Sequence, residues 1–222
     1  MSTTKKKTKV VPVREHTRKV PISNKNPQGT TLVDRHLRHI DGQYLDQKMI
    51  DEIFSSYKNS NLVYPSKNKL LFTNESKFDI LIAVWCDYFN KKFDLSPGLD
   101  PNMIKALIAT ESGFDPNAKN KNALGLTQVT KDTLKIVQNL SGEAKEFVFK
   151  DINQKDLKNP NTSIAIATRW LVQKEKLARF KLKRAPTSDE VVMEYKGILK
   201  DKSEKASRIM RDYRKYYASL TK

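Results

Sequence analysis

The 222-residue chain has few cysteines, few histidines and no long apolar run. Its one cysteine, Cys86, excludes an intramolecular disulfide and a metal cluster held by several thiolates. The longest apolar run, residues 80–86, lies between two aspartates and is far shorter than the roughly 20 residues of a membrane span. The histidines all lie near the start, with no cluster of cysteines or carboxylates beside them: His16, His36 and His39. We therefore expect no membrane span and no metal site.

Acidic residues are also in deficit, with 25 Asp and Glu against 42 Lys and Arg and a net charge of +17. Residues 1–50 carry 11 basic and 4 acidic side chains, whereas residues 51–100 are close to neutral. Such a balance indicates anionic surroundings, such as nucleic acid, anionic lipid or the acidic polymers of a bacterial wall. At 38% hydrophobic residues, the chain can bury a core, and its length suits one domain with an appendage.

The residue composition and the apolar periodicity change along the chain. Residues 1–45 interleave Pro, Gly, Thr, Asn and Lys without a helical period, which predicts a basic, irregular and flexible N-terminal arm. Its first lysines are not followed by an apolar stretch, so we expect no ordinary secretory signal. Residues 46–95 are predicted to form a helical extension that packs on the domain formed by residues 96–222. We expect a mainly α fold, because no strand-like alternation of useful length occurs.

Six helices can be placed by their apolar faces and end signals, and the first has its apolar face at Leu45, Met49, Ile50 and Ile53. One covers 78–89, and the next begins at Asp100 and Pro101 and ends at Gly113. A further helix follows Pro160. A capping box, Thr187 and Glu190, starts the fifth. The last helix is predicted to bury one set of residues: Ile209, Tyr213, Tyr216, Tyr217 and Leu220.

Glu111 continues the apolar stripe of the helix that ends at Gly113. Burial disfavours an ionised carboxylate, and the negative end of the helix dipole acts in the same direction. A carboxylic acid that stays neutral is the general acid that cleavage of a glycosidic bond requires. A glutamate near a helix end is by itself a weak signal, since it is more often a solvated end residue.

The sequence around Glu111 resembles the E-S-x-F … A-x-G-L-M-Q … T signature of the soluble lytic transglycosylase family, whose fold is shared with goose-type lysozyme. The matching residues run from Glu111-Ser112-Gly113-Phe114 through Ala123 and Gly125-Leu126-Thr127-Gln128 to Thr133. Two later segments resemble the family's P-x-x-N-I-x-x-G-x-x-Y-L helix and its Y-N-x-G segment: Pro160 to Leu171, and Tyr195-Lys196-Gly197. The resemblance covers about residues 96–220 and implies a lysozyme-like helical domain.

By this resemblance, Glu111 is the sole acid and base, and Tyr195 hydrogen-bonds its carboxyl. The glycan would lie along Ser112, Thr127, Gln128, Tyr195 and Lys196. The Gln128 amide is expected both to donate to and to accept from an N-acetyl group. No metal and no organic cofactor is implied.

The chain departs from the family pattern at four positions. Thr127 stands in place of Met, Ser163 of the helix Asn, Ala167 of the helix Gly, and Lys196 of the Asn after the tyrosine. An ammonium close to Glu111 would favour the ionised carboxylate and oppose the acid role. We expect Lys196 to point outward to solvent instead.

The resemblance implies a peptidoglycan lytic transglycosylase that cleaves the MurNAc–GlcNAc β-1,4 bond and forms 1,6-anhydro-MurNAc. Asp115, the nearest second carboxylate, is more simply a turn residue, so the 2-acetamido group of the substrate would assist. A weak peptidoglycan-binding module of the same fold and a hydrolytic lysozyme are the alternatives. Nucleic acid is disfavoured, because the Lys and Arg residues form no recognisable motif.

Peptidoglycan as the substrate implies that the protein acts on the cell wall, in the periplasm or outside the cell. The export route is not visible in the sequence. Association with a phage tail or a secretion apparatus, through the N-terminal arm, is the expected context.

Overall fold

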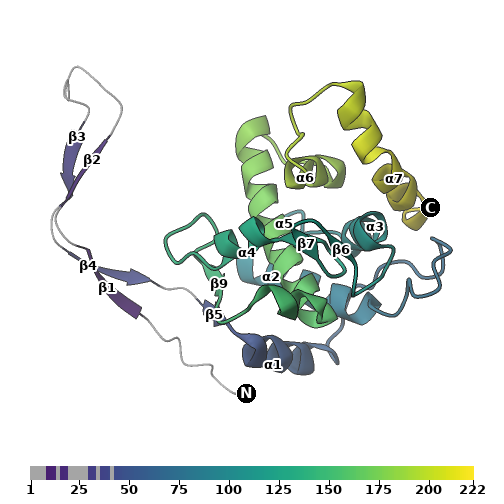
Figure 1. The fold of residues 1–222 in the computed structure, drawn as a ribbon, viewed down its shortest axis with the longest axis horizontal. Helices are drawn as coiled ribbons and strands as arrows, with labels where there is room; N and C mark the ends of the chain where they lie inside the picture. Colours follow the sequence, from purple (N-terminus) through teal and green to yellow (C-terminus); the bar gives the residue numbers. More distant parts are fainter. Residues whose placement is uncertain (1–8, 14–15, 20–29, 34–35, 41–42) are drawn as a thin grey trace. The chain divides into compact units, whose positions relative to one another are not determined.

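A computed structural model describes the backbone of residues 9–13, 16–19, 30–33, 36–40 and 43–222, and the side chains of residues 44–222 (Figure 1). The chain divides into two units, residues 1–43 and residues 44–222. The division of the second unit into an extension and a domain at residues 95 and 96 stays a prediction.

The described residues of the first unit form four strands. β1 (Lys9–Val13) pairs antiparallel with β4 (His36–Ile40), and β2 (His16–Lys19) pairs antiparallel with β3 (Thr30–Val33). Valine and threonine are frequent in β1 and β3, and β-branched residues favour extended backbone. The backbone of the three histidines lies in β2 and β4, and their side chains lie outside the described residues.

The second unit is mainly helical, as expected. Its helices are α1 (Gln47–Tyr57), α2 (Asp79–Phe93), α3 (Pro101–Ser112), α4 (Lys131–Val137), a 3-10 turn η1 (Gln154–Lys158), α5 (Pro160–Leu182), α6 (Ser188–Tyr195) and α7 (Glu204–Leu220). Its short strands are β5 (Gln43–Leu45), β6 (Lys119–Asn120), β7 (Ala123–Leu124), β8 (Val129–Thr130) and β9 (Phe147–Phe149). β5 pairs with β9, and β6, β7 and β8 form a small antiparallel sheet in that order. No helix among the described residues is long and apolar enough to cross a membrane.

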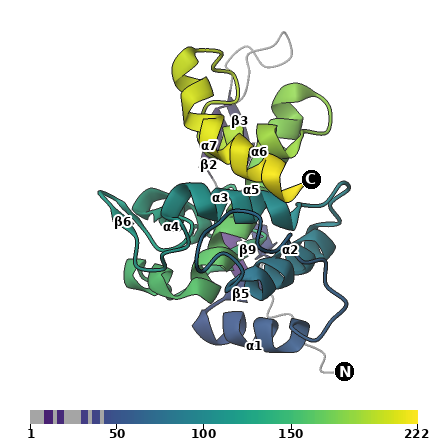
Figure 2. The same ribbon diagram turned by 90° about the vertical axis from the view of Figure 1, so that its right-hand side faces the viewer.

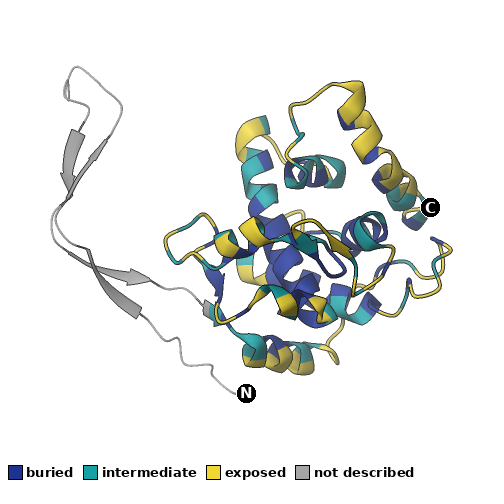
Figure 3. Cartoon of the chain, viewed as in Figure 1, coloured by how far each residue is buried: buried dark blue, intermediate teal, exposed yellow. Residues whose placement is uncertain are grey.

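α5 is the central helix of this unit. It contacts α1, α2, α4 and α6, and Figures 1 and 2 show the other helices arranged around it. Its N-terminal two thirds are buried almost all round, which Figure 3 shows in dark blue. A helix that is buried on every side lies inside the core rather than on its surface. Trp85 and Cys86, which were expected in the core, are buried in α2.

α3, the helix that carries Glu111, begins and ends where the sequence predicts. The Asp100 side chain accepts a hydrogen bond from the Asn102 N–H at 2.8 Å, and Pro101 occupies the first turn. Gly113 ends the helix with a φ of 57°, the left-handed conformation that favours glycine. The end of α3, and with it the position of Glu111, is therefore fixed by local sequence.

α7 packs on α3, whereas α6 packs on α5 and also contacts α3. The predicted capping box of Thr187 and Glu190 starts α6, and α7 contacts α3 along its length. The Tyr217 hydroxyl donates to Asp100 Oδ2 at 2.7 Å. The prediction for Ile209 was wrong, because the buried stripe of α7 runs through Met210 and leaves Ile209 38% exposed.

Lys105 forms a buried ion cluster in the middle of α3. Its ammonium lies 2.9 Å from Asp79 Oδ1 and 3.9 Å from Glu75 Oε1, and it donates to the Ser66 carbonyl at 2.8 Å. Glu75 also accepts backbone N–H bonds from the segment that precedes α2. Burial raises the pKa of Asp79, and the ammonium of Lys105 opposes that rise. The cluster attaches the chain before α2 to α3.

Candidate functional site

Glu111 lies in the last turn of α3, and a cluster of aromatic rings packs where this helix ends. Phe114 follows the helix with a φ of 66° and is buried, which directs the chain back into the core. Its ring meets Phe72 edge to face at 5.4 Å, and Phe72 meets Tyr216 of α7 at 5.5 Å. Rings in such contacts hold the helix end firmly in place.

Lys196 forms an ion pair with Glu111, with Nζ 2.5 Å from Oε1. The side chain of Glu111 is 20% exposed and that of Lys196 is 14% exposed. The expectation that Lys196 points outward to solvent was wrong. Lys196 caps the C-terminus of α6, and α6 contacts α3, so a long lysine stem at that position reaches the carboxylate.

The loop after α3 is bent back by Gly125. The φ of Gly125 is 79°, and a Cβ atom at this position would lie 1.9 Å from the Leu157 carbonyl oxygen. No other residue type fits without a shift of the backbone. The Gly125 N–H donates to the Ala118 carbonyl at 3.0 Å, which closes the loop. Residues 118–128, which include β6 and β7, therefore form a closed loop.

Gln128 uses its amide nitrogen to hold this loop. Nε2 donates to the carbonyl oxygens of Ala118 at 3.0 Å and Gly125 at 2.9 Å. Both N–H bonds of a glutamine amide are then engaged, so only the side-chain oxygen remains for a ligand. The expectation that the Gln128 amide both donates to and accepts from a sugar was wrong for the donor half in this conformation.

Thr127 and Ser163, two of the departures from the family pattern, bond to each other. Their hydroxyl oxygens lie 2.9 Å apart, and Thr127 Oγ1 also donates to the Ser163 carbonyl at 3.2 Å. Thr127 is fully buried. Its side chain therefore joins the loop to α5 and does not face a sugar, contrary to its assignment as a substrate-binding residue.

The Tyr195 hydroxyl donates a hydrogen bond to the Thr127 carbonyl at 3.2 Å. The sequence analysis had expected the carboxyl of Glu111 to be its partner. Burial raises the pKa of Tyr195 well above its usual range, and the negative charge of Glu111 adds to that rise. Tyr195 thus joins the end of α6 to the loop that carries Gln128.

The side chains of Ser112 and Asp115 form hydrogen bonds with nearby backbone groups. The Ser112 hydroxyl donates to the Ile108 carbonyl one turn earlier in α3, at 3.2 Å. Asp115 is exposed, and its carboxylate accepts from the Asn117 N–H at 2.8 Å, which is the turn role predicted for it. Neither residue contacts the carboxyl of Glu111 through these bonds.

The structure therefore brings the predicted residues together as two adjoining groups, Glu111 with Lys196 and the loop of Thr127 and Gln128 with Tyr195. Phe72 was not predicted to belong here. A Cβ atom at Gly113 would lie 3.4 Å from its ring, so this ring covers the end of α3. Phe72 lies 39 positions before Glu111 on a segment without helical periodicity, and no pattern in the sequence could have placed it.

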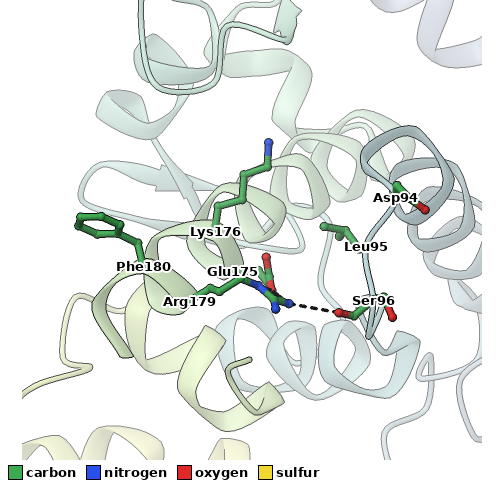
Figure 4. Close-up of a pocket in the computed structure, with 7 residues that line it drawn as sticks. All are labelled: Asp94, Leu95, Ser96, Glu175, Lys176, Arg179 and Phe180. Atoms are coloured by element: carbon green, nitrogen blue, oxygen red, sulfur yellow. Dashed lines mark hydrogen bonds and ion pairs between the residues drawn. The ribbon is translucent and has the colours of Figure 1, made fainter. Parts of the chain in front are cut away.

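Two surface pockets lie elsewhere on the second unit. One has a volume of about 480 Å³ and lies between the loop after α2 and the C-terminal half of α5. Figure 4 shows that Arg179 reaches from its α5 side to the Ser96 carbonyl, to which it donates at 3.3 Å. The other, about 270 Å³, lies beside the start of α6. Neither pocket is lined by Glu111, Gln128 or Tyr195.

Comparison with known proteins identifies the family. The family model described as "Transglycosylase SLT domain" matches residues 88–198, half of the chain. The chain belongs to the transglycosylase SLT family. The match extends from the second half of α2 to the turn after α6 and includes the ion pair and the loop. No curated protein matches the chain.

The transglycosylase SLT domain supports lytic transglycosylase activity in general. Transglycosylases are a class of glycan-cleaving enzymes. Its substrate is peptidoglycan, and its place of action is the cell wall.

Proposed function

We propose that the chain is a peptidoglycan lytic transglycosylase that cleaves the MurNAc–GlcNAc β-1,4 bond and leaves a 1,6-anhydro-MurNAc end. The observation that carries the proposal is the position of Glu111, a half-buried carboxyl on a rigidly ended helix within the SLT match. The charged group that the structure brings to it is a cation, Lys196, and not a second carboxylate. A single acid suits a reaction in which the substrate supplies the second group.

In the proposed reaction, Glu111 gives a proton to the oxygen that leaves MurNAc, and the glycosidic bond breaks. The 2-acetamido group of the same sugar stabilises the cation that forms at C1. Glu111, now a carboxylate, takes the proton of the sugar's own 6-hydroxyl, whose oxygen closes the anhydro ring at C1. The proton returns to Glu111, so the cycle needs no water, metal or cofactor.

The side-chain oxygen of Gln128 and the position of Tyr195 support this proposal as groups of the proposed sugar-binding site. Gln128 keeps one free acceptor, which suits the N–H of an N-acetyl group. Tyr195 holds the loop at the position of Gln128 through Thr127. We assign Ser112 and Thr127 to the support of this site through their backbone contacts.

Product analysis tests the proposal. Purified sacculi are incubated with the full chain, and the soluble muropeptides are separated and weighed by mass spectrometry. The proposal expects products lighter by one water than reducing muropeptides. Reducing ends would identify a hydrolytic lysozyme instead.

A second candidate function is a glycan-binding module with little catalytic activity. The ion pair of Glu111 with Lys196 favours it, because an acid held as a carboxylate is a poor proton donor. In this case the chain would sediment with intact sacculi and release no soluble product.

The N-terminal segment bears on the setting of the activity. We propose that residues 1–45 dock the enzyme on a phage tail or a secretion apparatus, since this segment is strongly basic and its first 43 residues form a unit of their own. The identity of the neighbouring genes would test this assignment: tail, holin or secretion components support it, and unrelated metabolic genes count against it.

A further inference from the structure

The charge balance around Glu111 changes during the proposed reaction. In the structure, the carboxylate of Glu111 and the ammonium of Lys196 neutralise each other at 2.5 Å. As a general acid, Glu111 must instead carry a proton and face the glycosidic oxygen. The ammonium of Lys196 would then be left without an anion.

This unpaired charge would be costly, because both side chains are largely covered by protein. Lys196 is 14% exposed, and water can solvate it only in part. Within residues 44–222, the recorded anionic partner of its ammonium is Glu111. Removal of one partner from a desolvated ion pair weakens binding or stability mainly through the charge that remains.

The ammonium of Lys196 can move to another partner without a change of fold. A lysine has a flexible four-carbon stem and no fixed bonding plane. The next residue, Gly197, has a φ of 73°, and no atom lies within 4 Å of the position where its Cβ would be. The turn that carries Lys196 is therefore open on one side.

The substrate can supply the missing anion. Muramic acid carries a lactyl group that ends in a carboxylate, or in a peptide with carboxylates of its own. We propose that Lys196 exchanges Glu111 for a carboxylate of the glycan strand, which frees Glu111 to act as the acid. Lys196 thereby determines specificity for anionic glycans, an inference that rests on the function proposed above.

This exchange assigns a purpose to the departure of Lys196 from the family's Asn. An asparagine has no charge to be compensated and would not distinguish an anionic strand from a neutral one by charge. The lysine makes release of the acid depend on the arrival of the correct substrate. No covalent step is added, since only the ion pair changes partner.

The test compares glycan strands with the same strands after their carboxylates have been converted to neutral methylamides. Each is prepared with the stem peptides and without them, which separates peptide carboxylates from the lactyl carboxylate. Rates of anhydro-muropeptide release are measured for the wild-type chain and for Lys196→Met. Lys200→Met, an exposed lysine four positions later, is the matched control.

The wild-type rate is expected to fall about tenfold on amidation, whereas the Lys196→Met rate changes less than about twofold. Lys196→Met should also cleave the neutral strands faster than the wild-type chain does, because its Glu111 is free. Lys200→Met should behave as the wild type. Sensitivity that survives in the peptide-free strands assigns the lactyl carboxylate, and sensitivity confined to the intact strands assigns the peptide.

Equal wild-type rates on native and amidated strands would overturn the exchange while leaving the proposed function intact. Equal sensitivity of Lys196→Met and wild type to amidation would overturn it as well. If the wild-type chain releases no product from any strand, the proposed function fails. Binding of the strands, measured by sedimentation, then tests the exchange of partners by Lys196. Binding that is lost on amidation in the wild type but not in Lys196→Met supports the exchange, and equal binding contradicts it.

Discussion

α3 carries two ion pairs that differ in how completely their charges are satisfied. In the middle of the helix, Lys105 is fully buried and contacts Asp79, Glu75 and the Ser66 carbonyl. At the C-terminal end, Glu111 has one cation, Lys196, and both side chains keep a fraction of their surface in solvent. The two pairs lie on one helix about six residues apart.

The difference indicates that the two ion pairs have different roles. A charge that is bonded on several sides and sealed from water cannot change partner, so the Lys105 cluster can serve only the fold. A charge with one partner and some exposure can change partner at moderate cost. A third pair, Arg184 with Glu190, extends the comparison to the surface, since Arg184 is 54% exposed.

The largest effect is expected when the buried cluster is broken. Lys105→Met would leave Glu75 and Asp79 buried without their cation and should lower the free energy of unfolding by about 3–5 kcal/mol. Urea denaturation followed by circular dichroism measures this change. A loss below about 1 kcal/mol would show that the cluster is not structural.

A smaller effect on stability is expected at the candidate site. Lys196→Met should lower the free energy of unfolding by about 1–2 kcal/mol, less than Lys105→Met does, because the Glu111 side chain is 20% exposed and water can reach it when the ammonium is gone. The same denaturation experiment provides the value. A loss as large as that of Lys105→Met would remove the distinction between the two pairs.

The smallest effect is expected at the surface pair, and it should depend on pH. The hydrogen bond from Arg184 lowers the pKa of Glu190 from 4.5 to about 2. The pair therefore stabilises the fold fully above pH 4.5, and its contribution is lost as the pH falls through about 2. Arg184→Met should lower the Tm by no more than about 2 °C at neutral pH.

Calorimetric scans of the wild type and Arg184→Met at a series of pH values would show this trend. The two Tm values should converge as the medium becomes acidic. A difference that grows on acidification would contradict the assigned sign.

Much of the fold could be predicted from the sequence where local chemistry decides it. The ends of α3 follow from Asp100, Pro101 and Gly113, each of which acts on backbone at or close to its own position. Glu111 could be chosen because its neighbours form a motif. In α7, the apolar period left the register open by one position, so Ile209 was placed inward in place of Met210.

The contacts within the site could not be predicted in the same way. Lys196 meets Glu111 across 85 positions, and the sequence offered no reason to choose the carboxylate over solvent. The Tyr195 hydroxyl donates to a backbone carbonyl, and the Thr127 hydroxyl bonds to that of Ser163, because three separate segments meet there. Such choices depend on tertiary packing and not on local pattern.

The central claim is that Glu111 performs the cleavage, and a set of three chains tests it most directly. Anhydro-muropeptide release from purified sacculi is measured for the wild type, for Glu111→Gln and for Asp115→Asn, the acidic control three residues after the helix. The account predicts release by the wild type and Asp115→Asn, and a loss of at least about a thousandfold in Glu111→Gln, with that chain still folded and its binding to sacculi retained. Release by a folded Glu111→Gln chain at a rate near that of the wild type would contradict the account.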